Sequence, residues 1–497
     1  MIQAIPIGDH SFIVSDLHLA EGNLDRGRTL GTENFFSDTE FSELLQHLQQ
    51  RFNESGGTPL CLIINGDFID YIRITLIPHS KENFSDWQKE IHKVQPHFSI
   101  PPNCVSSKEK KYGLKTNNYK CIWKLMCCMQ GHAAFFHALS VWVGAGNQII
   151  INVGNHDPEW YWSWLQDYFK FRIWEIHGAH INLRSVFETN IVFSIKAFSI
   201  YDKVWIDHGH NYEKMTSIDP DYEYNLVAPK HRFFNKKEAL RVINPSEKEL
   251  FIPFGSFFNR YLINKVELDF PFVDNLTVKG SMINALIDEN FKKVWNIIKS
   301  YGGYAYYVVQ KNFQESFLRA FFWIVFVFIP LVLFVVLYIE LPTNFIENRD
   351  TNSVTSGVII KYVNIGLKGL LNILIPIAFR LFFKKLFFWL KLSDPPLSES
   401  ALKDIGKGGS LSAFDYIVVG HNHYPQHIVQ DGKEYINSGT WTSKYVQKYE
   451  RIEIGITYNV VHISLDGQRK INAELLEWDA PNRELIPFNN FIPNHAI

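Results

Sequence analysis

Five runs of mostly apolar residues, each followed directly by a polar segment, constrain the fold of this 497-residue chain more than any other feature. The runs are SFIVS (11–15), LCLII (60–64), QIIINV (148–153), VWI (204–206) and YIVV (416–419). Short runs rich in β-branched and large apolar residues are typical of buried strands. Charge is costly inside such a strand, so charged groups collect where strands end. The pattern predicts an α/β protein with polar groups at the ends of its strands.

The segments that follow these runs carry oxygen and imidazole nitrogen atoms, which are common metal ligands. They are Ser-Asp-Leu-His at 15–18, Gly-Asp at 66–67, Gly-Asn-His-Asp at 154–157, His-Gly-His at 208–210 and Gly-His-Asn-His at 420–423. On an extended chain, Asp16 and His18 would lie on the same side and reach one cation. Asp67 is a lone carboxylate that suits the bridging of two cations. Carboxylate, amide and imidazole ligands without thiolates favour Mn, Fe or Zn over a structural cysteine-type zinc site.

The remaining candidate ligands are the amide oxygen of Asn155 and the imidazoles of His208, His421 and His423. Two ions about 3.5–4 Å apart can hold a bridging hydroxide and clamp a phosphoryl group for in-line attack. His156 follows Asn155 directly, so we expect it to protonate a leaving oxygen or to stabilise charge on a phosphoryl group.

Other polar residues near the motifs leave alternatives open. Asp70 is a candidate for orienting a ligand. His210 is a metal ligand, a phosphate contact or a solvated loop residue. We interpret His132, His137 and His427 as structural, because none of them belongs to a motif.

Taken in order, the five segments resemble the motifs of the calcineurin-like metallophosphoesterase superfamily: D-x-H, G-D, G-N-H-D/E, H and G-H-x-H. The resemblance implies one metal held by Asp16, His18, Asp67 and His423, a second held by Asp67, Asn155, His208 and His421, and a catalytic role for His156. It also implies a four-layer αββα sandwich of two mixed sheets. Two divalent ions are the expected cofactors, with manganese preferred and iron or zinc as alternatives.

The implied reaction is hydrolysis of a phosphate ester, phosphodiester or pyrophosphate bond. Ser-Asp-Leu-His-Leu at 15–19 resembles the UDP-2,3-diacylglucosamine pyrophosphatases, which agrees with cleavage of a pyrophosphate or phosphodiester near a membrane. That group usually has Arg at the position of His156, so its substrate does not transfer to this chain. Phosphoprotein phosphatases carry Arg-Gly after the second motif, and DFIDYI at 67–72 lacks it. The alternatives are a soluble nucleotide or phosphomonoester phosphatase and a catalytically silent scaffold on the same fold.

About two hundred residues separate the fourth and fifth motifs, and part of this insertion is strongly apolar. Residues 320–339 read AFFWIVFVFIPLVLFVVLYI and carry no charge. A helix of that length spans a hydrocarbon core of about 30 Å; a buried core helix is the alternative. Because the fifth motif must join the others in one site, the chain must return, and 357–379 is the candidate segment. Residues 377–392 are basic and amphipathic, as in helices that lie on an anionic membrane surface.

The charges around this segment predict its orientation. Arg319 and the basic residues of 380–391 flank it, whereas the loop 340–356 has a net charge of −2. Lys and Arg in excess favour the cytoplasmic side. We therefore expect a membrane protein with its catalytic domain on the cytoplasmic side; helices lying in one leaflet are the alternative. Five cysteines without the spacing of a disulfide framework agree with a reducing compartment.

These features predict the following division of the chain: 1–210, first part of the metallophosphoesterase core; 211–316, a cap-like insertion; 317–392, a membrane-associated hairpin; 393–480, second part of the core; 481–497, a C-terminal tail. The net charge of −2 provides no general basic field, so we expect no nucleic-acid partner. The expected partners are a phosphorylated small molecule or lipid and the membrane.

Local patterns predict further elements. Apolar residues at helical spacing from Phe41 to Phe52 indicate a helix. Asp431-Gly432 between short apolar stretches indicates a hairpin. We expect 452–464 and 470–478 to complete the second sheet, and the polar stretch 78–118 to form an exposed insertion. Three tryptophans (160, 162 and 164) are equally compatible with a substrate platform, core packing or contact with a membrane surface.

Overall fold

The computed structural model describes residues 3–5, 7–25, 28–29, 32–52, 58–213, 216–218, 226–227, 249–250, 252–253, 256, 259–260, 264, 397–405, 411–448 and 451–488. They all belong to one compact unit, formed by Met1–Ala285 together with Pro395–Ile497. The predicted membrane-associated hairpin, 317–392, lies outside the described residues, as does most of the predicted cap, 211–316. Among the residues that are described, no helix has the length and apolarity needed to span a membrane.

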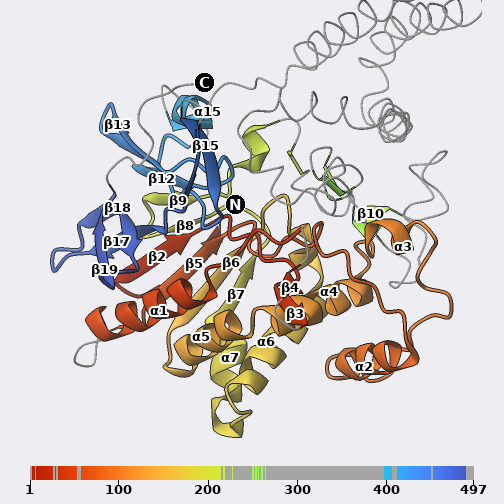
Figure 1. The fold of residues 1–497 in the computed structure, drawn as a ribbon. Helices are drawn as coiled ribbons and strands as arrows, with labels where there is room; N and C mark the ends of the chain where they lie inside the picture. Colours follow the sequence, from red (N-terminus) through yellow and green to blue (C-terminus); the bar gives the residue numbers. More distant parts are fainter. Residues whose placement is uncertain are drawn as a thin grey trace, which may run out of the picture. The chain divides into compact units, whose positions relative to one another are not determined.

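The protein is α/β with two mixed sheets (Figure 1). The larger sheet has seven strands, in the order β19 (Glu484–Pro487), β18 (Ile471–Asp479), β17 (Asn459–Leu465), β2 (His10–Val14), β5 (Cys61–Asn65), β6 (Gln148–Asn152) and β7 (Ile191–Ser194). Strands β2, β5, β6 and β7 are parallel, as expected for strands joined by helical crossovers. Strand β17 runs antiparallel to β2, with His462 opposite Phe12.

The placement of β17 and β18 corrects one expectation. Residues 452–464 and 470–478 do not complete the second sheet, because β17 and β18 extend the sheet that contains β2. The part of 452–464 that precedes β17 contributes to a separate two-stranded ribbon, β15 (Lys444–Lys448) and β16 (Arg451–Gly455).

The second sheet has six strands, in the order β1 (Gln3–Ala4), β8 (Phe198–Ile200), β9 (Val204–Ile206), β12 (Tyr416–Val419), β14 (Lys433–Asn437) and β13 (Gln426–Gln430). Strands β9, β12 and β14 are parallel. The predicted hairpin is confirmed: Asp431 and Gly432 have φ values of 52° and 73° and connect β13 to β14. Two shorter ribbons pair β3 (Asn23–Asp25) with β4 (Arg28–Thr29), and β10 (Leu226–Val227) with β11 (Glu249–Leu250).

Alternate residues of the central strands enter different cores. Ile13, Ile63 and Ile150 pack against residues of the six-stranded sheet such as Ile206 and Val418. Their neighbours along the chain enter a second core, which also contains helical residues; these neighbours are Phe12, Val14, Leu62, Ile64, Ile149 and Ile151. Each central strand is therefore buried on both faces, which explains why its sequence is a continuous apolar run.

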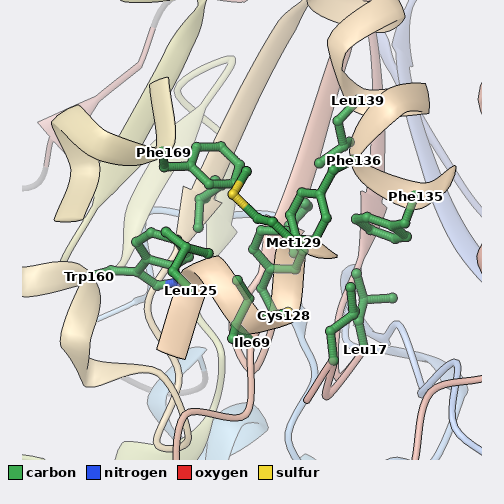
Figure 2. Close-up of a cluster of buried hydrophobic side chains, with 14 of the residues drawn as sticks. Leu17, Ile69, Leu125, Cys128, Met129, Phe135, Phe136, Leu139, Trp160 and Phe169 are labelled. Carbon is green, nitrogen blue, oxygen red and sulfur yellow. The ribbon is translucent and has the colours of Figure 1, made fainter. Parts of the chain in front are cut away.

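The helices supply the rest of this second core. They are α1 (Asp38–Phe52), α2 (Lys81–His92), α3 (Glu109–Tyr112), α4 (Asn118–Gly131), α5 (Ala133–Gly144), α6 (Ser163–Ile176) and α7 (Arg184–Asn190), with short 3₁₀ turns η1 (Pro158–Tyr161), η2 (Ile181–Leu183) and η3 (His210–Tyr212). The predicted helix beginning near Phe41 is confirmed as α1. In Figure 2, Met129 of α4 and Phe136 of α5 lie between Trp160 and Leu17. Burying a large apolar side chain contributes about 1.5–3 kcal/mol.

Burial also decides between alternatives for the aromatic residues. Trp160 and Trp162 are buried, so core packing accounts for both.

The stretch 78–118 is not simply an exposed insertion, because Trp87 and Ile91 of α2 are fully buried. On the other sheet, Ala401 of α15 (Leu397–Ile405) packs with Ile417 and Tyr435 in a third core.

Candidate metal centre

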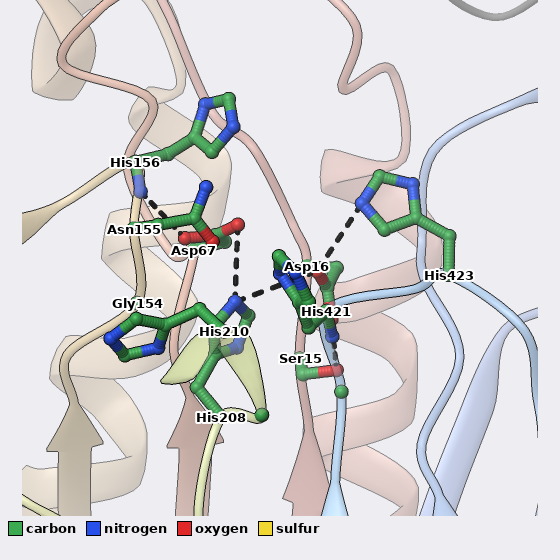
Figure 3. A network of polar contacts seen from close by, with 12 residues as sticks. Ser15, Asp16, Asp67, Gly154, Asn155, His156, His208, His210, His421 and His423 are labelled. Carbon is green, nitrogen blue, oxygen red and sulfur yellow. Dashed lines mark hydrogen bonds and ion pairs between the residues drawn. The ribbon is translucent and has the colours of Figure 1, made fainter. Parts of the chain in front are cut away.

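The predicted polar residues follow the carboxyl ends of parallel strands in both sheets. In the seven-stranded sheet, Asp16 and His18 follow β2, Asp67 follows β5, and Asn155 and His156 follow β6; in the six-stranded sheet, His208 follows β9, and His421 and His423 follow β12. The ends of neighbouring parallel strands lie at one edge of a sheet, so these loops meet (Figure 3).

The first group of converging ligand atoms belongs to Asp16, His18 and His423. The Nε2 atom of His423 lies 3.2 Å from Asp16 Oδ1 and 3.0 Å from His18 Nε2. The Nε2 atom of His18 lies 3.8 Å from Asp16 Oδ1. Two imidazole nitrogens and a carboxylate oxygen therefore face a common point, which is an arrangement that can hold one cation.

The second group comprises Asp67, His208 and His421. The Nε2 atom of His208 lies 3.2 Å from Asp67 Oδ2. The same Oδ2 atom lies 3.7 Å from His18 Nε2 of the first group. Asp67 is thus placed between the two groups, in the position expected of a bridging carboxylate.

Four predicted ligand atoms are buried and make no well-directed hydrogen bond to any described residue: Asp16 Oδ1, Asn155 Oδ1, His208 Nε2 and His421 Nδ1. Two of them have an ion-pair contact inside the site, Asp16 Oδ1 with His423 and His208 Nε2 with Asp67. A buried polar atom left unsatisfied costs about 1–3 kcal/mol, and native interiors rarely contain such atoms. The opposite atom of His208 is satisfied, because its Nδ1 donates to the backbone oxygen of Asn65 at 2.8 Å. This bond leaves the Nε2 lone pair directed into the site. Cations at the two groups would satisfy these atoms, so the residues present fit a metal pair.

Asp70 connects a predicted ligand to the predicted catalytic histidine. Its Oδ2 atom lies 3.1 Å from His18 Nδ1, 2.8 Å from His156 Nδ1 and 3.2 Å from Arg73 Nε. The backbone nitrogen of His156 donates to Asp67 Oδ1 at 2.8 Å. Burial lowers the pKa of His156, but the carboxylates of Asp70 and Asp67 outweigh it and raise this pKa to about 9. These carboxylates therefore favour the protonated form of His156, which can donate a proton.

The carboxylates of the site are ionised. Burial raises the pKa of Asp67, but the imidazoles of His208, His156 and His18 hold it well below its usual range. Asp157, which belongs to the third segment, has a different function: its carboxylate accepts from the backbone nitrogens of Gly154, at 2.6 Å, and Phe68, at 2.9 Å. It thereby ties together the loops that carry Asp67 and Asn155, and burial raises its pKa to about 7.

The backbone of the site is strained. Five non-glycine residues have φ in the left-handed region: Asp16 (52°), His18 (51°), Asp67 (49°), His421 (74°) and His423 (60°). Such conformations cost on the order of 1–3 kcal/mol each and cluster at functional sites. They correct the expectation that Asp16 and His18 lie along an extended chain, since the backbone turns at both. Gly154 is needed for a different reason: a Cβ atom there would collide with the side chain of Asp67.

Sequence reasoning missed the residues that hold these ligands from outside the motifs. Glu213 and Thr216 contact the imidazole of His421, and Ser256 contacts the backbone of Asn155. No pattern in their local sequence distinguishes them. Arg73 could have been found from its spacing, because it lies three residues after Asp70.

The structure also shows the surroundings of the histidines outside the proposed ligand set. His210 is buried, which excludes a solvated loop residue, and its ring centroid lies 5.5 Å from that of His208. His427 pairs with Glu434 on the hairpin at 2.8 Å, and buried His132 lies between Glu33 and Asp38.

Comparisons with protein-family models, curated proteins and solved structures gave no match to this chain.

Proposed function

We propose that this protein is a dinuclear metal-dependent phosphoesterase. The observation that carries the proposal is the convergence of buried carboxylate and imidazole ligand atoms on both sides of Asp67. In the proposed centre, Asp16, His18, Asp67 and His423 hold one divalent ion, and Asp67, Asn155, His208 and His421 hold the other. Manganese is the preferred ion, with iron or zinc as alternatives, because the ligands are carboxylates, an amide and imidazoles.

The arrangement of the cores supports the same assignment. One core lies between the two mixed sheets, a second contains α1, α4, α5 and α6, and a third contains α15. This order is the one expected of a four-layer αββα sandwich, the fold implied by the resemblance to calcineurin-like metallophosphoesterases.

The two ions, when bound, would supply an activated water and compensate the charge of a phosphoryl group. The protein itself would supply the proton for the leaving oxygen. The imidazolium of His156 is held by Asp70, which fixes the direction of its ring, and its side chain is 12 % exposed, so a substrate can reach it. A phosphodiester or pyrophosphate is the preferred substrate class.

We further propose that the substrate is lipid-linked and is hydrolysed at the cytosolic face of a membrane. The support for this part of the proposal is the apolar segment 320–339 and the basic segment 377–392.

The substitution Asp67→Asn tests the proposal. It removes the charge that both ions would share, so we expect loss of the Mn²⁺-dependent hydrolysis of bis-p-nitrophenyl phosphate and loss of bound metal measured by mass spectrometry. Asp431→Asn in the exposed hairpin turn is the matched control, because Asn tolerates the φ of 52° found there. Retained Mn²⁺-dependent hydrolysis in Asp67→Asn would refute the bridging role. If Asp67→Asn is inactive as expected, a screen of the wild-type protein with nucleoside diphosphate-lipids, cyclic nucleotides and phosphomonoesters would identify the substrate class.

A further inference from the structure

Residues of the long insertion between the fourth and fifth motifs hold two of the candidate ligands in place. Both ligands, Asn155 and His421, belong to the proposed metal site that also includes Asp67 and His208. The contacts come from two parts of the insertion, one around 213–216 and one around 256–264.

The first part orients the imidazole of His421. The Nε2 atom of His421 lies 3.1 Å from Glu213 Oε2 and 3.2 Å from Thr216 Oγ1. The other ring nitrogen, Nδ1, is buried and makes no hydrogen bond to any residue in the described part of the chain. A carboxylate that accepts from one nitrogen of a histidine fixes the tautomer and makes the other nitrogen a better metal ligand. Glu213 is therefore placed to direct the Nδ1 lone pair of His421 into the site.

The second part fixes the backbone of Asn155. The Oγ atom of Ser256 is buried and donates to the backbone oxygen of Asn155 at 2.9 Å. This bond holds the peptide that joins Asn155 to His156. Because the Asn155 side chain is short, the position of its backbone determines where Oδ1 points.

Two further residues anchor Ser256. Arg260 Nη2 donates to the backbone oxygens of Gly113 and Leu114 at 2.7 Å, and Asn264 Nδ2 donates to the backbone oxygen of Ile72 at 2.7 Å. Ser256, Arg260 and Asn264 recur every four residues, the spacing of one face of a helix, and all three are buried. Each of these three residues donates to a backbone oxygen of the part of the chain that carries the first three motifs.

The other candidate site has supports from within the motif-bearing part of the chain. Asp16 Oδ2 accepts from Ser15 Oγ at 2.5 Å and from the backbone nitrogen of His421 at 2.8 Å, and the backbone oxygen of Asp16 accepts from Thr440 Oγ1 at 2.7 Å. His18 is oriented by Asp70.

We propose that Glu213, Thr216 and Ser256 are positioning residues that set the metal affinity of the site formed by Asp67, Asn155, His208 and His421. This inference rests on the proposed dinuclear centre and assigns a function to part of the insertion. Because these three described residues contact ligands of this site, their substitution should weaken this site more than the other.

Calorimetric titration of the full-length metal-free protein with Mn²⁺, followed by electron paramagnetic resonance of the bound ions, tests the proposal. The wild-type protein should bind two ions that are magnetically coupled. Glu213→Gln and Ser256→Ala should each weaken one of the two ions by roughly 10-fold or more. At low Mn²⁺ concentration, both variants should give the spectrum of a single isolated ion. Ser256→Thr keeps the hydroxyl and should restore binding of two ions.

Two matched controls distinguish positioning from a general effect of the substitutions. Glu434→Gln removes a carboxylate–imidazole pair of similar length, to His427 at 2.8 Å, on the hairpin. Ser140→Ala removes a buried hydroxyl that donates to the backbone oxygen of His137 at 2.7 Å in α5. Both controls should bind two ions as the wild-type protein does.

The outcomes separate this inference from the proposed function. If the wild-type protein binds two ions and both variants bind them with unchanged affinity, the positioning role is overturned. Equal weakening of both ions in the two variants would overturn it as well. If the wild-type protein binds no Mn²⁺, the proposed dinuclear centre itself fails.

Discussion

At the scale of single residues, the site combines ionised carboxylates, converging imidazole ligand atoms and strained backbone. The left-handed φ of Asp16, His18 and Asp67 costs free energy that the surrounding structure must offset. The offset is visible around Asp16, whose carboxylate and backbone oxygen accept hydrogen bonds from Ser15, His421 and Thr440. The residues are thus held in a geometry that they would not adopt in a free peptide.

A residue-scale prediction concerns His156. Because Asp70 orients the imidazole of His156 and favours its protonated form, His156→Gln should lower turnover of a diester by about 10²–10⁴-fold, the usual contribution of a general acid. Binding of two Mn²⁺ ions, measured by calorimetry, should persist. The control is His427→Gln, which alters an imidazole on the hairpin. Loss of one ion in His156→Gln would instead make His156 a ligand, in line with its proximity to His18 and Asp67.

At the scale of elements, His132 joins the junction of α4 and α5 to the loop that precedes α1. Its Nε2 atom lies 3.1 Å from Glu33 Oε2, and its Nδ1 atom lies 3.1 Å from Asp38 Oδ1. The Glu33 carboxylate also accepts from the backbone nitrogens of Gly22 and Phe35. Burial lowers the pKa of His132, but the bonds to Asp38 and Glu33 outweigh it and raise this pKa to about 9.

This ion cluster predicts a pH dependence of stability. Because the folded-state pKa of His132 lies above its usual 6.5, its contribution is fully present below pH 6.5 and is lost as the pH rises through about 9. A shift of this size corresponds to about 3 kcal/mol. Urea unfolding should give a free energy of unfolding that falls over this range. His132→Gln should reduce the decline but not abolish it, because His156, whose pKa is also raised to about 9, contributes over the same range. An unchanged slope in His132→Gln would contradict the assignment.

The ligands could be predicted from the sequence because each lies directly after a strand that its own residues specify. Asp67 follows LCLII, and His421 follows YIVV, so a local pattern is sufficient in both cases. The partners of the ligands could not be predicted in this way. Ser256 reaches Asn155 across about one hundred residues, and no local pattern encodes such a contact.

The sheet topology could likewise be predicted only where a local pattern specifies it. The parallel strands were identified from their apolar runs, whereas the partner of β17 was not. The alternation of residues along β17 specifies a strand but does not specify which edge it joins. Pairing of His462 with Phe12 depends on tertiary packing, since these residues are separated by nearly the whole chain.

At the scale of the whole molecule, two parts of the chain that are far apart in sequence contribute to the candidate metal centre. The described residues before 265 supply Asp67 and His208, and those after 396 supply His421 and His423. A segment inserted between them must leave and re-enter the core on the same side of any membrane that it contacts.

A molecule-scale prediction follows for the segment 317–392. Replacing it with a flexible Gly/Ser linker should release the protein from membranes, because it removes the apolar run 320–339 and the basic residues after 379. Sedimentation of cell fractions, with and without an alkaline wash, measures the change. Release by alkali of the unaltered protein would favour helices lying on one leaflet, and continued sedimentation of the variant would refute the anchor.

The antiparallel pairing of β2 with β17 has a consequence for how the protein is made. Strand β2 has β5 on one side and β17 on the other, so its partners come from residues 61–65 and 459–465. A ribosome adds the intervening residues, about 400, in roughly 20–80 s at ordinary rates of synthesis. During that interval one edge of β2 has no native partner, and an open edge favours aggregation. The nascent chain therefore needs protection, from a chaperone or from its own insertion, until the last strands emerge.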